Sequence, residues 1–232
     1  VRRLATVEKQ RADLHARSVQ AVLGPHFLFN SLDTIVGMVS QKNYDALMRT
    51  LKALTIQLEG AVRNFETEVS VAQELEYVSS YLEIQSQRYR GHFSVDMRVS
   101  PEVRFETIPR FCIQPVVENC FTHAIPYATD PVSILISVSD YDANTIAVVV
   151  SDSGPGMSED ARTALLEAFA NDENPERHGV GLYTVHSRLA TAYGEKYGIR
   201  IADSEFEGSE YGVDGIYAGM TVVVLLPKGP EL

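Results

Sequence analysis

The sequence has little cysteine and no long apolar run, and both absences narrow what the protein can be. Its two cysteines, Cys112 and Cys120, fit neither a C-x-x-C redox pair nor a zinc knuckle. We expect buried, reduced thiols of the kind that cytosolic proteins carry. No apolar run approaches the roughly 18–20 residues that span a bilayer, and no signal segment is visible.

Positive charge is also in the minority. Lys and Arg number 20 against 31 Asp and Glu, which gives a formal net charge of −11. Nucleic acid and anionic membrane both require a basic face, because neutralisation of phosphate dominates that binding. We therefore expect no direct nucleic-acid partner, although this balance does not exclude one local anion site. Hydrophobic and charged contents of 45% and 22% are typical of a folded chain.

The first part of the chain has a helical pattern. Residues 1–40 contain few helix breakers, chiefly Gly24 and Pro25, and a rough heptad of apolar residues predicts packing against a partner helix. Asn43 is expected to cap a second helix. One face of this helix is apolar and carries Leu47, Leu51, Leu54 and Leu58. Such a hairpin buries one side, and a dimer would bury the other in a four-helix bundle. A monomeric hairpin folded against the rest of the chain is the alternative.

After a hinge at residues 60–68 the pattern changes. The predicted elements are, in chain order, a helix at 69–89, a strand at 93–99, an apolar helix at 110–124, strands at 132–139 and 145–151, a polar segment at 152–181, a helix ending near 193, and strands near 199–204 and 216–226. A helix pair followed by mixed strands and helices indicates an α+β chain. We expect a helical domain at residues 1–64 and a second domain at 65–232.

A strand-end motif, Asp152-Ser-Gly154-Pro-Gly156, is the first of three suited to binding a nucleotide. Its glycines let a backbone turn sharply or approach a ligand closely. The carboxylate of Asp152 can accept a hydrogen bond from an exocyclic amine such as that of adenine. Taken alone, the motif is equally compatible with a plain strand-to-loop turn.

The second motif, His178-Gly179-Val-Gly181-Leu182, opens a predicted helix. Glycines at a helix N-terminus expose backbone N–H groups and the positive end of the helix dipole, which suits phosphate. A flexible start to the helix is the alternative reading.

The third motif runs from Gln114 to His123 on a predicted helix, where Asn119 and His123 are four residues apart and share a face. An amide oxygen is a hard ligand, suited to a Mg²⁺ ion that also holds phosphate oxygens. A buried asparagine satisfied by the backbone is the alternative.

In order and spacing, the three motifs resemble the GHKL ATP-binding domain of histidine kinases, gyrase, mismatch-repair and heat-shock ATPases. The resemblance implies a two-layer α/β sandwich that holds ATP between the helix of Asn119 and a mobile lid. It implies Asn119 on Mg²⁺, Asp152 on adenine, and glycines against the phosphates. The further residues of the implied ATP site are His123, Arg177 and Leu182. Solvent exposure is the alternative for Arg177 and His178, which lie in the lid.

One branch of that group is indicated by Pro25-His26-Phe-Leu-Phe-Asn30, which resembles the phosphoacceptor motif of LytS-type sensor histidine kinases. Residues 74–88, 108–109 and 219–222 resemble further blocks of that family. The resemblance implies ATP-dependent autophosphorylation of His26. A largely neutral imidazole at pH 7 is a suitable nucleophile, although a core or capping histidine is the usual reading of such a position.

The same resemblance implies partners. These are a second copy of the chain, a response regulator whose receiver aspartate takes the phosphoryl group, often of the LytTR type, and an upstream membrane sensor. The sequence begins at Val1, so we expect a piece of a longer protein, the cytoplasmic portion of a membrane-anchored bacterial kinase. Three residues depart from the family pattern: Val22, Gly24 and Thr122, the last standing where a phosphate-contacting Lys is common.

Two other functions compete. A hydrolytic ATPase of the same fold would carry a general-base Glu one helical turn before Asn119, and this position is Pro115, which cannot act as a base. A catalytically weak nucleotide-binding signalling scaffold is the second. Thr122 and Val22 favour it, whereas the presence of His26 and Asn119 opposes it.

Overall fold

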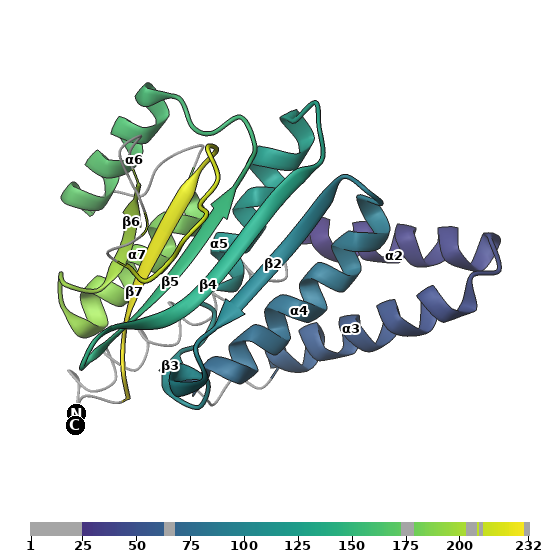
Figure 1. The fold of residues 1–232 in the computed structure, drawn as a ribbon. Coiled ribbons are helices and arrows are strands. Elements are labelled where there is room, and N and C mark those ends of the chain that lie inside the picture. The colour runs from purple at the N-terminus through teal and green to yellow at the C-terminus, as the bar shows by residue number, and fades with distance from the viewer. Residues whose placement is uncertain (1–24, 63–67, 173–178, 203–207, 209–210, 230–232) are drawn as a thin grey trace, which may run out of the picture.

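A computed structural model of the protein describes residues 25–62, 68–172, 179–202, 208 and 211–229. Its first elements are helix α2 (Pro25–Ser40) and helix α3 (Tyr44–Val62), which form an antiparallel hairpin beside helix α4 (Val71–Arg88) (Figure 1). Asn43 precedes α3, and its Oδ1 accepts a hydrogen bond from Ala46 N at 3.3 Å, as the predicted cap requires. The predicted heptad at residues 4–22 lies outside the described residues.

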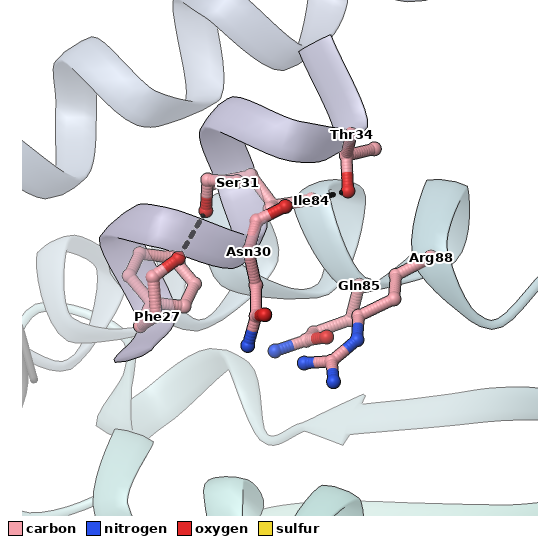
Figure 2. Close-up of a pocket in the computed structure, with 7 residues that line it drawn as sticks. All are labelled: Phe27, Asn30, Ser31, Thr34, Ile84, Gln85 and Arg88. Carbon is pink, nitrogen blue, oxygen red and sulfur yellow. Dashed lines mark hydrogen bonds between the residues drawn. The ribbon is translucent and has the colours of Figure 1, made fainter. Parts of the chain in front are cut away.

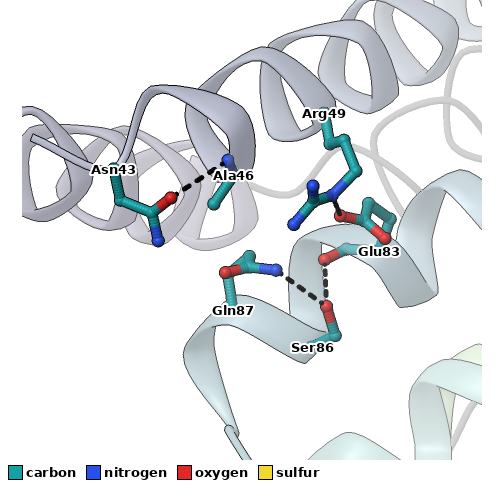
Figure 3. A network of polar contacts seen from close by, with 6 residues as sticks. All are labelled: Asn43, Ala46, Arg49, Glu83, Ser86 and Gln87. Carbon is teal, nitrogen blue, oxygen red and sulfur yellow. Dashed lines mark hydrogen bonds and ion pairs between the residues drawn. The ribbon is translucent and has the colours of Figure 1, made fainter.

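The hairpin is fixed to the rest of the molecule mainly through α3 and α4. The buried residues of α3 include Ala46, Ala53, Leu54 and Gln57. Arg49 of α3 pairs with Glu83 of α4 at 3.1 Å (Figure 3). The apolar face predicted for this helix is therefore divided, because Leu51 and Leu58 are exposed.

The second part of the chain is built on a five-stranded sheet in the order β2-β4-β5-β7-β6. The strands are β2 (Phe93–Val99), β4 (Val132–Asp142), β5 (Thr145–Asp152), β6 (Gly198–Ile201) and β7 (Thr221–Pro227). Only the β2–β4 pair is parallel. A separate antiparallel pair joins β1 (Glu68–Ser70) to β3 (Thr107–Pro109).

Helices cover one face of this sheet, as expected for the two-layer α/β sandwich (Figure 1). The remaining helices are η1 (Pro101–Val103), α5 (Gln114–Asn119), η2 (Cys120–Ala124), η3 (Ile125–Tyr127), α6 (Glu159–Asn171) and α7 (Val180–Tyr193). The main hydrophobic cluster lies between these helices and the sheet. On the opposite face, Tyr211 and Val213 pack over β5 and β7, so β5 is buried along its whole length.

Two predicted segments differ from the structure. The polar segment predicted at residues 152–181 contains helix α6, whose N-cap Ser158 accepts from Ala161 N at 3.3 Å. Of its residues only Leu165 and Ala168 are buried, so its apolar residues do not form the wide buried face by which a helix is recognised in sequence. The helix predicted at 110–124 is shorter, because Phe111 has φ of 54° and the π-helical η2 follows α5. Among the described residues no helix is long and apolar enough to cross a membrane.

Candidate functional site

The predicted adenine ligand Asp152 is the last residue of the central strand β5. Its side chain is only 4% exposed, and Oδ1 accepts hydrogen bonds from Gly154 N at 2.8 Å and Met220 N at 3.4 Å. Its backbone N–H donates to Met220 O, and its carbonyl accepts from Gly219 N. Burial raises the pKa of Asp152, while the N–H groups of Gly154 and Met220 oppose that shift. The carboxylate is thus fixed in orientation by the backbone around it.

Two residues next to Asp152, Gly154 and Gly219, have no room for a Cβ atom. A Cβ at Gly154 would lie 2.6 Å from Ala124 Cβ, and a Cβ at Gly219 would lie 2.3 Å from Asp152 O. Gly156 has φ of 75°, a conformation that other residues rarely adopt. The sequence motif therefore has a structural role, in addition to any close approach of a ligand.

The predicted metal ligand Asn119 ends α5 and lies at the same corner. Its Nδ2 donates to Met220 Sδ at 3.4 Å, and Met220 is the residue whose backbone holds Asp152. The structure thus brings Asn119 and Asp152 together through one residue of the chain before β7. His123 is half-buried in η2. Because η2 is wound as a π-helix, it alters the predicted placement of Asn119 and His123, four residues apart, on one helix face.

The start of α5 is held by Glu74, which lies in the family-like block at residues 74–88 and for which no individual role was predicted. Glu74 of α4 is fully buried, and its carboxylate accepts backbone N–H bonds from Phe111, Cys112 and Ile113 at 3.0, 3.0 and 3.1 Å. Arg188 of α7 donates to Phe111 O at 2.8 Å. Burial raises the pKa of Glu74, and these N–H groups and Arg188 oppose the shift. Glu74 therefore satisfies three buried N–H groups of the segment that leads into α5, the last of them at its N-cap.

A second buried polar group joins the hairpin to α5. Gln57 of α3 and Gln114 of α5 exchange hydrogen bonds, with Gln114 Nε2 to Gln57 Oε1 at 3.0 Å and the reverse bond at 3.3 Å. Gln114 Nε2 also donates to Glu118 Oε1 at 2.9 Å. Burial raises the pKa of Glu118 to about 8, although the hydrogen bond from Gln114 acts to lower it. These contacts link the hairpin to the residue directly before Asn119.

The two glycines at the start of α7 differ in how much space surrounds them. Gly179 is the N-cap with φ of 80°, and a Cβ there would lie 2.7 Å from Leu165 Cδ1 of α6. A Cβ at Gly181 would meet nothing within 4 Å. Leu182 is 1% exposed and packs in the main hydrophobic cluster. Arg177 and His178 lie outside the described residues, so the structure places neither of these two predicted residues.

The candidate phosphoacceptor His26 is the second residue of α2. The next residue, Phe27, stacks on Tyr81 of α4 with ring centroids 5.6 Å apart, and Tyr81 meets Phe121 of η2 edge-on at 5.4 Å. This end of α2 is therefore packed towards the helix that follows Asn119. Val22 and Gly24, two of the departures from the family pattern, lie outside the described residues.

Two protein-family models match successive parts of the chain. Residues 14–93 match the family model described as histidine kinase. Residues 111–230, more than half of the chain, match the model of histidine kinase-, DNA gyrase B- and HSP90-like ATPases. The chain belongs to the histidine kinase family.

Two curated histidine kinases are similar over most of the chain. It is 27% identical over 205 residues to sensor histidine kinase YesM of Bacillus subtilis, covering 88% of this chain and 34% of that protein. It is 30% identical over 210 residues to sensor histidine kinase/phosphatase LytS of Staphylococcus aureus, covering 89% and 34%. The chain thus spans about a third of the length of these relatives. The solved catalytic domain of histidine kinase ThkA has a TM-score of 0.48 at 18% identity, covering 71% of this chain and 98% of that one.

Proposed function

We propose that this chain is the kinase portion of a LytS-type sensor histidine kinase, which binds ATP and phosphorylates its own His26. The phosphoryl group would then pass to the receiver aspartate of a response regulator. The observation that carries this proposal is the corner where Met220 links Asn119 to Asp152, with the start of α2 packed towards it through Phe27. Residues 1–64 would serve as the dimerisation and phosphoacceptor helices, and residues 65–232 as the ATP-binding domain.

The carboxylate of Asp152 suits the exocyclic amine of adenine. Two backbone N–H groups fix one carboxylate oxygen, so the group is oriented before any ligand binds. Such preorganisation reduces the entropy lost on binding. Gly156, Gly179 and Gly181 would lie against the phosphates, together with His123 and Arg177.

Asn119 suits a magnesium ion that is shared with ATP. Its Nδ2 is held by Met220, and its Oδ1 accepts no hydrogen bond from the described residues. In the part of the chain that the structure describes, no three His, Cys, Asp or Glu side chains could together hold a metal ion. Phosphate oxygens and water would therefore supply most ligands, as is usual for Mg²⁺ in ATP sites. The ion would neutralise charge on the phosphates.

In the proposed reaction a nitrogen of His26 forms a bond to the γ-phosphorus of ATP. The bond from that phosphorus to the β,γ-bridging oxygen breaks, and ADP leaves with the electron pair. The imidazole proton is released to water. Phosphoryl transfer needs mainly an in-line nucleophile and charge stabilisation, which a neutral imidazole and the Asn119 corner would supply.

An exposed apolar surface on the hairpin supports a homodimer. We define this hairpin surface by eight residues that are between 40% and 67% exposed: Phe29, Leu32, Val36, Val39, Tyr44, Met48, Leu51 and Leu58. Those on α2 recur every three or four residues, the spacing of a helix that packs on other helices. Monomeric proteins rarely expose so continuous an apolar area. An upstream membrane sensor and a LytTR-type regulator complete the proposal, with the chain on the cytoplasmic side.

The test is incubation of the chain with Mg²⁺ and γ-labelled ATP. Wild type should acquire acid-labile, alkali-stable label, whereas His26→Gln and Asn119→Ala should acquire essentially none. His92→Gln is the matched control, because His92 is an exposed histidine outside the site. Labelling of His26→Gln at the wild-type rate would refute His26 as the acceptor.

One observation favours the scaffold as a second candidate. Thr122 stands where a phosphate-contacting Lys is common, and its hydroxyl donates to Glu118 O of its own helix at 3.1 Å. A nucleotide-binding assay run beside the labelling assay separates the two functions. Binding of ATP with no label on any residue would favour the scaffold.

A further inference from the structure

A small recess lies between α2 and the C-terminal half of α4. Its lining residues are Phe27, Asn30, Ser31, Thr34, Ile84, Gln85 and Arg88. Figure 2 shows the amide ends of Asn30 and Gln85 and the guanidinium of Arg88 turned towards the same space. The recess is therefore lined by both polar and apolar side chains.

The two hydroxyl groups of the recess are occupied by the helix itself. Ser31 Oγ donates to Phe27 O at 2.7 Å, and Thr34 Oγ1 donates to Asn30 O at 2.7 Å. The guanidinium of Arg88 is the charged donor that faces the recess, beside the amides of Asn30 and Gln85, which have interactions of their own. Planar N–H groups of this kind, and the fork of an arginine above all, suit phosphate oxygens.

Arg88 has no carboxylate partner among the residues that the structure describes. Its guanidinium carbon lies 5.0 Å from the centroid of the Tyr89 ring, and it forms none of the ion pairs found there. Glu83, a nearby acid on the same helix, is paired with Arg49.

The recess also lies next to the candidate phosphoacceptor. Position 26 is one helical turn before position 30 in α2, which is about 6 Å along the axis. Phe27, the residue after His26, itself lines the recess. A phosphoryl group on His26 would add about two negative charges here, and no other described arginine or lysine lines this space.

We propose that Arg88, which faces the recess beside Asn30 and Gln85, binds the phosphoryl group that His26 carries after transfer. This assignment rests on the proposed function, since it requires phosphorylation of His26. It gives Arg88 a role in holding and neutralising the transferred group, separate from the ATP corner at Asn119 and Asp152.

The direct test is the Nε–H resonance of Arg88 in ¹⁵N-labelled protein, assigned by its loss in Arg88→Gln. Addition of Mg²⁺ and ATP should shift this resonance in wild type and leave it unchanged in His26→Gln. Inorganic phosphate added to His26→Gln controls for a free anion. A full shift in that control, or no shift in phosphorylated wild type, would overturn the proposal.

A rate measurement provides a second readout. Arg88→Gln should label about tenfold more slowly than wild type at an unchanged KM for ATP, because one charged donor to the phosphoryl group is lost. Asn30→Asp should also slow labelling, since it adds a negative charge without changing side-chain size. Arg90→Gln, an exposed arginine outside the recess, is the matched control.

The outcomes separate the two proposals. If His26→Gln labels like wild type, the acceptor assignment fails and the role of Arg88 fails with it. If His26 is the acceptor but Arg88→Gln labels like Arg90→Gln, only the role of Arg88 is refuted. Circular dichroism and thermal melting of each variant exclude unfolding as the cause.

Discussion

At the scale of single residues, the site contains polar groups whose surroundings are unusual for their type. Asp152 and Glu74 are buried carboxylates that several backbone N–H groups satisfy, and Gln57 is a buried amide paired with another amide. Leaving any of these groups without partners would cost roughly 1–3 kcal/mol. Their hydrogen bonds are therefore conditions for the fold as well as features of the site.

His186 gives a pH dependence that can be tested. Its ring stacks on Phe169 at 4.2 Å, and Ile199 N donates to Nδ1 at 3.1 Å. Burial lowers the pKa of His186, although Asp172 opposes that shift. The unfolded chain, with an ordinary pKa of about 6.5, then binds the proton more tightly. The contribution of this group to stability is complete above that pH and is lost as the pH falls towards the folded pKa.

We therefore expect the melting temperature of wild type to fall more steeply between pH 7 and pH 5 than that of His186→Asn. His92→Asn, at an exposed position, should keep the wild-type slope. Differential scanning calorimetry across this range measures the slopes. Equal slopes for wild type and His186→Asn would show that His186 makes no such contribution.

At the scale of elements, the position of Asn119 depends on how α5 begins. This helix has only six residues and no side-chain cap of its own, so it depends on Glu74 of α4. The contact that positions the proposed metal ligand thus comes from about 40 residues earlier in the chain, a separation typical of tertiary contacts rather than local caps.

Glu74→Gln should destabilise the protein by about 2 kcal/mol, because an amide N–H₂ would face backbone N–H donors in a buried site. It should also weaken ATP binding by displacing α5. Urea denaturation and nucleotide titration measure the two effects. Glu76→Gln, on the exposed side of the same helix, should change neither. A Glu74→Gln variant with wild-type stability would mean that the carboxylate is not needed to start α5.

At the scale of the whole molecule, the hairpin surface defined above holds eight of the twelve large apolar residues that are exposed in the described part of the chain. It lies on α2 and α3, away from the side on which they contact α4. Burial of this surface between two copies would remove eight large side chains from water at once, each contributing roughly 1–2 kcal/mol when buried.

Val36→Glu should therefore shift the protein from dimer to monomer, because a charge at a helix–helix seam must be desolvated. Leu166→Glu, at an exposed apolar position of α6 outside the hairpin surface, is the control and should leave the dimer intact. Sedimentation velocity over a range of concentrations distinguishes the species. A Val36→Glu variant that sediments like wild type would contradict this surface as the dimer contact.

Much of the fold and the candidate site could be predicted from local pattern. Strand β2 was predicted with its observed bounds, and β4 and β5 with bounds that differ by three residues or fewer, because alternation along a strand is visible in sequence. Helix α6 was missed because few of its residues are buried. The short pair β1 and β3 was missed because three residues show no periodicity.

The sequence by itself determined the family and predicted roles for His26, Asn119 and Asp152, since these residues stand in short motifs whose spacing is local. Only the tertiary structure decided which distant residues serve them. Glu74 contacts residues 37 to 39 positions away, and Gln57 contacts Gln114 across 57 positions. Such contacts depend on how helices pack on the sheet, and no pattern of neighbouring residues specifies that packing.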